Sequence, residues 1–324
     1  MRRPARGLRG GRAMDIRQPF ERQIERRGVI HVPCSPLWDG ATLPSVGGKP
    51  LIYYPLTAMI DAGIEEVAIV APQAPRAALE ALLGTGAHLG MTVHHITQAP
   101  GGGMARAPHL AREFLGGMPA LLMPGDGIVS AARLSDILAR AAPRLRGAAV
   151  LTAHAATGGE DISVIANGLG VVTRLDPRPD PVHDPLEDGA EVFTGVALLD
   201  ARAPDFASWL PSSGATMIDL LGLYQSSGAL CAARIGDGGI AMSVKTPSAA
   251  EDATRFVKGL ERRRRGLFGS PELAALKAGR IEREDVARAA RIWDDTAYGA
   301  ALADALARRR GPRAPTDALR ISAL

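Results

Sequence analysis

An aspartate that follows a short apolar run is the residue of this chain best placed to do chemistry. Asp126 stands in the run Pro124-Gly125-Asp126-Gly127, directly after Ala120 to Met123, whose four apolar residues indicate a buried strand. In open α/β sheets, ligands bind beyond the carboxyl ends of the strands, and a carboxylate there suits a divalent cation. Asp-Gly is also among the commonest turn pairs, so an ordinary turn residue is an equally good interpretation.

A glycine-rich turn stands before this strand. Gly101-Gly102-Gly103 follows Gln98 and opens a segment, Met104 to Leu115, in which apolar residues recur at helical spacing. The stretch therefore predicts, in order, a loop, a helix, a buried strand and an acid at the edge of a sheet.

The elements that must position these residues alternate between strand and helix. Strand patterns are seen at 28–32, 66–70, 91–96, 120–123, 148–153, 192–199 and 230–235, and helix patterns at 55–63, 76–83, 134–141 and 217–223. This alternation predicts an α/β fold with a mainly parallel, doubly wound (Rossmann-like) sheet that is covered on both faces. Asn167-Gly168 between two further strand patterns predicts a β-hairpin.

The chain divides into three predicted parts. Residues 1–27 form a basic lead-in, 28–246 an α/β domain, and 247–324 a helical C-terminal region. The Arg/Gly-rich start carries no apolar segment of a secretory signal and is predicted to be disordered, and translation from Met14 in place of Met1 stays open.

Composition limits the partners. No apolar run approaches the ~20 residues of a membrane helix, and 46% apolar with 22% charged residues is ordinary for a globular protein. The distant Cys34 and Cys231 lack metal-ligand spacing, which favours a cytoplasmic location. A net charge of +4 comes largely from two arginine clusters without interleaved aromatic residues, which argues against nucleic acid as a partner.

Several longer runs carry a family resemblance: KPLIYYPLTAMIDAGIEEVAIV from Lys49, QAPGGGMARA from Gln98, PGDG from Pro124, FTGVALLD from Phe193, IDLLGLYQSSG from Ile218, and GSPELAALKAGRIEREDVARAARIWDDTAYGAAL from Gly269. In these runs the chain resembles the sugar-1-phosphate nucleotidylyltransferases, most closely the glucose-1-phosphate thymidylyltransferases. The resemblance implies a nucleotide-binding α/β domain, a small β-hairpin region on the sugar side, and a helical C-terminus that often joins oligomer contacts.

The resemblance also implies a reaction and a set of site residues. In this family a sugar phosphate attacks the α-phosphate of a nucleoside triphosphate and releases pyrophosphate, with Mg²⁺ and basic groups neutralising charge. By their positions in the motifs, Gln98 and Gly103 would face the nucleobase, Thr194 and Gly195 would lie beside the sugar, and Asp126 would bind the metal.

The sequence departs from the family pattern at most other positions. After the first strand, PCSPLWDGATLP replaces the GGxGTRL loop, and proline cannot supply the backbone N–H groups that wrap a triphosphate. The phosphate-binding lysine aligns with Ala41, and the second metal aspartate falls near Ser243. The sugar-contacting tyrosine becomes Ala197, the YGV run becomes Ile162 to Val164, and EEKP becomes Asp176 to Pro179, in which Arg178 could still hold a phosphate.

Two functions follow from this mixture. The favoured hypothesis is a non-catalytic homologue (a pseudoenzyme) that regulates, scaffolds, or senses a nucleotide or sugar phosphate, in contact with other copies of itself or an intact paralogue. The alternative is an active, divergent nucleotidylyltransferase with Mg²⁺ on Asp126 and substitute cations at Arg178, Arg106 or Lys245.

Other chemical candidates have structural interpretations. His94-His95 ends a strand, where neighbouring side chains point to opposite faces, so packing or surface exposure is predicted. Trp293 and Tyr298 are predicted to pack a helix interface. Glu261 to Arg265 is predicted to be a solvated helix face, with a basic patch for an anionic effector as the alternative.

Overall fold

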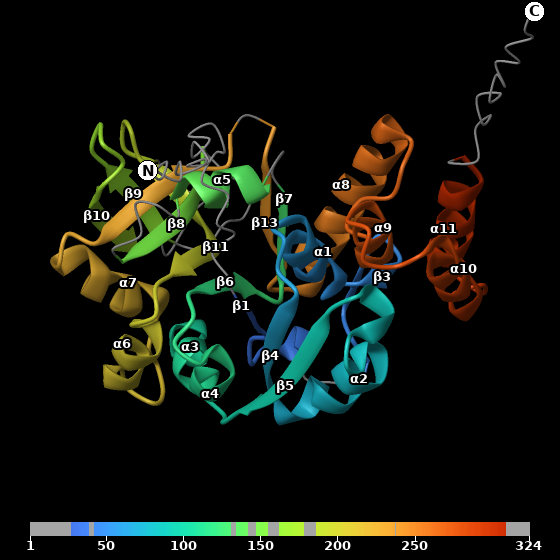
Figure 1. Ribbon diagram of the computed structural model, residues 1–324. Coiled ribbons are helices and arrows are strands. Elements are labelled where there is room, and N and C mark those ends of the chain that lie inside the picture. Colours follow the sequence, from blue (N-terminus) through green and yellow to red (C-terminus); the bar gives the residue numbers. More distant parts are fainter. Residues whose placement is uncertain are drawn as a thin grey trace, which may run out of the picture.

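The computed structural model describes residues 27–38, 42–130, 134–141, 147–154, 162–177, 186–236 and 238–308. Within these ranges the chain forms a mixed, mostly parallel nine-stranded sheet with helices on both of its faces (Figure 1). This confirms the predicted α/β, Rossmann-like fold.

The central sheet has the order β10-β9-β11-β6-β1-β4-β5, and β8 lies between β11 and β12. Its strands are β1 (Arg27–His31), β4 (Glu66–Pro72), β5 (Thr92–Gln98), β6 (Ala120–Pro124), β8 (Ala148–Ala153), β9 (Ile162–Ala166), β10 (Val172–Pro177), β11 (Glu191–Leu199) and β12 (Leu230–Arg234). The pairs β1–β4, β1–β6, β4–β5 and β8–β12 are parallel, whereas β11 runs antiparallel to its neighbours. Because the chain passes from β1 through β4 to β5 and then returns to β6, the sheet reverses its winding beside β1.

The helices lie in two layers and a C-terminal group (Figure 1). Their bounds are α1 (Tyr53–Asp61), α2 (Gln73–Leu83), α3 (Ala107–Leu110), α4 (Arg112–Leu115), α5 (Leu134–Ala141), α6 (Ala203–Trp209), α7 (Met217–Ser226), α8 (Pro247–Arg264), α9 (Pro271–Lys277), α10 (Arg283–Ile292) and α11 (Ala297–Arg308). One hydrophobic core lies between the sheet and α1, α8, α9 and α11, and the other between the sheet and α3, α4, α6 and α7.

Of two further predicted features, the β-hairpin forms as expected and the helix after the glycine-rich turn does not. The hairpin at Asn167 forms between β9 and β10, and the Asn167 carboxamide oxygen accepts bonds from two turn N–H groups, those of Leu169 and Val171. The single helix predicted after the glycine-rich turn is instead three short pieces, the 3₁₀ helix Met104–Arg106, α3 and α4. Pro108 lacks the N–H that would bond back one turn, so a continuous helix loses a hydrogen bond there.

The aromatic residues of the C-terminal helices pack as predicted. The Trp293 and Tyr298 rings lie 5.9 Å apart, nearly perpendicular, and both contact the Tyr53 ring of α1. The prediction for Glu261 to Arg265 is wrong at Glu261, which is turned inward and pairs with the buried Lys49 at 2.9 Å. No described helix is both long enough and apolar enough to span a bilayer.

Candidate functional site

The carboxyl ends of β1, β4, β5 and β6 gather the candidate residues at one edge of the sheet. His31 is paired with Val70 of β4 and Pro124 of β6, and Gln98 with Pro72 of β4. Asp126 follows β6 directly, and the Gly125 N–H donates to the His31 carbonyl at 2.7 Å. This edge includes the point beside β1 where the winding reverses, which is where open α/β sheets bind ligands.

Asp126 is buried, with 5% of its surface exposed, at the start of a short ladder formed by β7 (Gly127–Ser130) and β13 (Ile240–Ser243). Ser243, the predicted neighbour of the metal aspartate, pairs with Gly127. One residue further, the Val244 N–H donates to the Asp126 carbonyl at 2.8 Å. The ladder thus places Val244, a fully buried aliphatic residue, opposite Asp126.

These residues do not fit a metal held by two aspartates. Val244 offers no oxygen ligand, and the buried Ser243 hydroxyl has no hydrogen-bond partner among the residues that the structure describes. Within the same ranges, no three His, Cys, Asp or Glu side chains come close enough together to hold a metal ion. Asp126 is therefore the one predicted ligand of the pair that the described chain retains.

The glycine-rich turn packs tightly against Gln98 and Ala215. Gln98 is 2% exposed, and its side-chain N–H donates to the Gly102 carbonyl. A Cβ on Gly102 would lie 2.8 Å from the Gln98 side chain, and one on Gly103 would lie 2.6 Å from the Ala215 carbonyl oxygen. Close packing alone therefore requires glycine at these two positions, whatever ligand the turn faces.

His31 is a site residue that the sequence did not single out. It is buried at the end of β1, and burial lowers its pKa to about 4 because the charged imidazolium is poorly solvated, an effect that Gln98 opposes. His31 Nε2 and Gln98 Oε1 are both buried and without a hydrogen bond of ordinary geometry to any described group. The only signal in the sequence was one polar residue within the apolar run GVIHV.

The segment after β1 is anchored in the protein interior by one aromatic side chain, that of Trp38. A 3₁₀ helix, Pro36–Trp38, follows the strand, and the Trp38 N–H donates to the Ser35 carbonyl at 2.9 Å. The Trp38 side chain is 1% exposed and belongs to the larger core, while its indole N–H has no acceptor among the described residues. Ala41 lies outside the described residues.

On the predicted sugar side, β11 carries an irregularity. Its register with β8 shifts between Phe193 and Ala197, and Gly195 within the shift has a φ of +84°. The Thr194 hydroxyl donates to the Leu151 carbonyl at 2.9 Å. Such β-bulges redirect side chains next to binding sites, which keeps the prediction for Thr194 and Gly195 open.

Three residues were predicted as replacements for the missing phosphate-binding cations, and the structure describes two of them. Arg178 lies outside the described residues. Arg106 donates to the Ala207, Leu210 and Ser208 carbonyls at 2.7, 2.9 and 3.3 Å, so its guanidinium caps the end of α6. Lys245 is exposed and directly follows Val244. The idea that Arg106 replaces a phosphate-binding cation is thus corrected to a structural role.

Comparison with known proteins places the chain in a family. Residues 41–160 match the nucleotidyl transferase family. A glucose-1-phosphate thymidylyltransferase of Xanthomonas campestris (strain B100) is 30% identical over 296 residues, which cover 88% of this chain and 98% of that protein. The chain belongs to the sugar-1-phosphate nucleotidylyltransferase family.

Other relatives agree with this assignment. A glucose-1-phosphate thymidylyltransferase of Neisseria gonorrhoeae is 28% identical over 259 residues, covering 78% of this chain and 86% of that protein. Two solved structures share the fold. A putative glucose-1-phosphate thymidylyltransferase of Bacillus anthracis, in complex with a sucrose, has a TM-score of 0.60 at 20% identity, covering 71% and 94% of the two chains. A UTP-bound UGPase of Acinetobacter baumannii has a TM-score of 0.55 at 16% identity, covering 73% and 94%.

Proposed function

We propose that this protein is a non-catalytic member of its family that binds a nucleotide or a sugar phosphate and acts as a regulatory or scaffold subunit in the cytoplasm. The observation that carries the proposal is Val244 opposite Asp126. In this proposal the Asp126 carboxylate alone would have to hold Mg²⁺ against a triphosphate, where the family uses two carboxylates. The Val244 isopropyl group fills the facing position and excludes water and a cation from it.

The segment after β1 supports the same conclusion. Triphosphate chemistry depends on positioning and on groups that neutralise developing charge, and losing one such donor costs about 10²–10³ in rate. In this chain Pro33 and Pro36 remove two N–H donors, and Trp38 directs its side chain into the core. Together with the missing acid, these changes would remove most of the catalysis.

Binding is supported by the polar atoms that stay at the edge of the sheet. His31 Nε2 and Gln98 Oε1 are buried atoms whose side chains also interact with each other, and a ligand with a hydrogen-bonding ring would bind there by replacing that contact. In this proposal Gln98 and Gly103 face a nucleobase, Thr194 and Gly195 face a sugar, and Asp126 alone contacts any Mg²⁺.

The second candidate function is catalysis by an active, divergent sugar-1-phosphate nucleotidylyltransferase. It is favoured by the buried Asp126 carboxylate at the reversal point of the sheet, with the exposed Lys245 two residues after Ser243. Lys245 or Arg178 would then carry the charge that the arginine of the usual loop carries.

A pyrophosphate-release assay separates the two functions. Purified protein is incubated with Mg²⁺, glucose 1-phosphate and dTTP or UTP, beside Asp126→Asn. We expect the two proteins to release pyrophosphate at the same background rate. Release by the unaltered protein that Asp126→Asn abolishes would establish the active enzyme instead.

Ligand binding is tested by thermal shift with the same nucleotides and with glucose 1-phosphate. A ligand at 100 times its Kd stabilises the folded state by about 2.7 kcal/mol, which gives a clear rise in Tm. If none of these compounds raises the Tm, the binding role fails and a purely scaffolding role remains. Size-exclusion chromatography, alone and with an intact paralogue, then tests for a homo-oligomer or a mixed complex.

A further inference from the structure

A groove with a mainly basic lining lies between α8 and α11 and shares no lining residue with the candidate site. Its volume is about 1050 Å³. Small-molecule sites in proteins typically measure ~300–1,000 Å³, so the groove has room for a small ligand. The charged side chains of its described lining are the basic Lys258, Arg262, Arg265 and Arg308 and the acidic Glu261 and Asp304.

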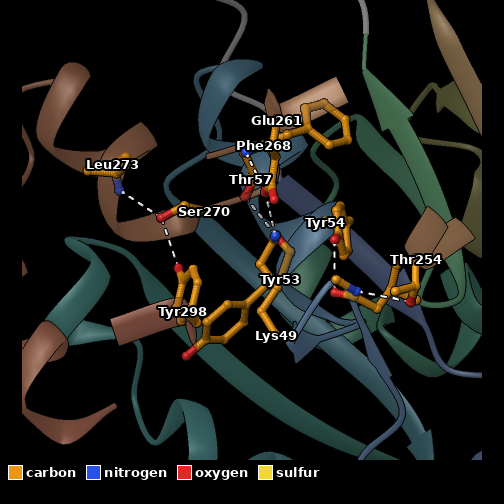
Figure 2. Close-up of polar contacts among 12 residues, drawn as sticks. Lys49, Tyr53, Tyr54, Thr57, Thr254, Glu261, Phe268, Ser270, Leu273 and Tyr298 are labelled. Atoms are coloured by element: carbon orange, nitrogen blue, oxygen red, sulfur yellow. Dashed lines mark hydrogen bonds and ion pairs between the residues drawn. The ribbon is translucent and has the colours of Figure 1, made fainter. Parts of the chain in front are cut away.

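The Glu261 carboxylate does not neutralise these cations, because it is turned into the protein. It accepts a hydrogen bond from the ammonium group of Lys49 on β3 (Lys49–Pro50) at 2.9 Å (Figure 2). The Phe268 N–H donates to the same carboxylate at 3.0 Å. Since the Lys49 side chain is fully buried, this ion pair belongs to the interior. Asp304 is therefore the one acid of the described lining that is left to face four cations.

Three of the four cations have no partner among the described residues. The side chains that form neither an ion pair nor a hydrogen bond there are those of Lys258, Arg262 and Arg265, and all three are exposed. Basic side chains at a helix end can cap its last carbonyl groups. In α8, however, the Gly266 N–H donates to the Glu261 carbonyl at 3.2 Å, and the Arg308 guanidinium donates to the Arg265 carbonyl at 2.8 Å. Capping therefore does not account for the three remaining cations.

Arg265 ends α8 in a left-handed conformation, with a φ of +50°. It is the only described residue other than glycine that has a positive φ. Glycine is the common residue at this position of a helix end, because a Cβ is strained in the left-handed conformation. Backbone strain of this kind is often found at binding sites. Here it is combined with a cation on the lining of the groove.

The spacing of the cations indicates the kind of anion that fits. Lys258 and Arg262 are one turn apart, ~6 Å along the helix axis, and Arg265 and Arg308 follow at the end of α8. A single phosphate group is too small to contact a row of this length, whereas linked phosphate groups can. The apolar residues of the described lining are Leu267, Ala301 and Ala305. They offer a surface for the uncharged part of a ligand.

We propose that the groove between α8 and α11 is a binding site for a small ligand with two or more linked phosphate groups, such as pyrophosphate or a nucleoside diphosphate. Arg262 and Arg265 donate to the phosphate oxygens, and their planar forks of donors suit such oxygens. Arg308 and Lys258 supply charge at either end of the row. The site is separate from the one in the proposed function and uses none of its residues.

Isothermal titration calorimetry of the full chain with pyrophosphate tests the site. The wild type is compared with Arg262→Gln and Arg265→Gln. The matched control is Arg263→Gln, because Arg263 is an exposed arginine of the same helix end that does not line the groove. Each groove variant should weaken binding about tenfold or more, as expected for a lost hydrogen bond to a charged group, and the control less than about twofold. Absence of measurable binding to the wild type, or equal weakening in all three variants, overturns the proposal.

Hydrogen exchange with saturating pyrophosphate locates the ligand. We expect slower exchange over residues 258–267 and 301–308 in the wild type but not in Arg262→Gln. Unchanged exchange in these segments, or slower exchange confined to residues 31–38 and 98–103 at the edge of the sheet, overturns the proposal. The second of these results would leave the proposed function standing.

Titration of UDP beside pyrophosphate separates the two sources of linked phosphate groups. Tighter binding of UDP that Arg262→Gln also weakens assigns the groove to a nucleotide. Equal or weaker binding of UDP assigns it to an inorganic polyphosphate. Binding of both compounds that Arg262→Gln leaves unchanged overturns the proposal.

Discussion

Val244 lies opposite Asp126 on the β7–β13 ladder, one residue after Ser243, near which the second metal aspartate was predicted. Its side chain is fully buried, and its N–H binds the Asp126 carbonyl. The two side chains lie at facing positions of the ladder, where cross-strand neighbours are ~5 Å apart. At that separation a pair of carboxylates would repel each other strongly unless a cation lay between them.

Val244→Asp should therefore create a metal-dependent protein. Without a divalent cation we expect the variant to lose about 2–4 kcal/mol of stability, because a buried carboxylate without a partner replaces an apolar group. Addition of Mg²⁺ or Mn²⁺ should restore much of its Tm. The matched control is Val244→Asn, which has the same shape without the charge, and an equal response of both variants to Mg²⁺ would contradict the proposed geometry.

His31 gives a second prediction for a single residue. Its folded-state pKa of about 4 lies below the ordinary 6.5, so its contribution to stability is complete above pH 6.5 and falls as the pH drops toward 4. A shift of this size corresponds to about 3 kcal/mol. His31→Gln should flatten the fall of Tm between pH 7 and pH 4, because the variant lacks the buried imidazole. An unchanged profile in His31→Gln would show that the imidazole is not buried.

The sequence predicts a site residue when the evidence for it lies in neighbouring residues, but not when it depends on contacts between distant parts of the chain. Asp126 and Gln98 could be placed because each directly follows its own strand pattern. The pairing of Val244 with Asp126 could not, because β7 and β13 are only four residues each and their register depends on folding of the whole sheet. His31 was missed because one polar residue in an apolar strand does not change the strand pattern.

At the scale of elements, the predicted strands and most of the predicted helices of five or more residues lie within a few residues of their observed bounds. The hairpin β2 (Ser45–Val46) and β3 were missed because two-residue strands show no alternation. Helix α6 was missed as well, in a segment where prolines stand at Pro204 and Pro211. The 3₁₀ start of the α3 region follows a tight glycine turn, which periodicity does not detect.

The irregularity in β11 gives a prediction for one element. Gly195 has a φ of +84°, a conformation that costs other residues about 1–2 kcal/mol. Gly195→Ala should therefore lower the free energy of unfolding by about that amount. Gly222→Ala in α7 is the matched control: a Cβ there would meet nothing within 4 Å, so alanine should stabilise the helix by about 0.5–1 kcal/mol. Chemical denaturation measures both, and a stabilising Gly195→Ala would show that the strand is regular.

At the scale of the whole molecule, the larger core crosses the predicted boundary at residue 247. It unites strand residues such as Ile30 and Ile69 with Val257 of α8, Ala275 of α9 and Leu302 of α11. Helices that share a core with a sheet cannot leave it without exposing apolar surface to water. The predicted division into an α/β domain and a helical region therefore describes the chain order better than it describes the packing.

We accordingly expect the C-terminal helices to unfold together with the sheet. Hydrogen exchange followed by mass spectrometry should give similar opening free energies for the amides of α9 and α11 and those of β1 and β4. Opening of α9 and α11 at a free energy several kcal/mol lower would show that they form a separate unit.

The arginine bonds at helix ends have a consequence for how the protein responds to ionic strength. Several guanidinium groups donate to main-chain carbonyls: Arg106 to Ala207 and Leu210, Arg280 to Ile64, Arg283 to Leu306, and Arg308 to Arg265. Dissolved ions screen attraction between opposite surface charges but barely weaken a directed bond to a partly buried carbonyl. We therefore expect these contacts to persist in concentrated salt, and lysine, which has no planar fork of donors, would not replace arginine at these positions.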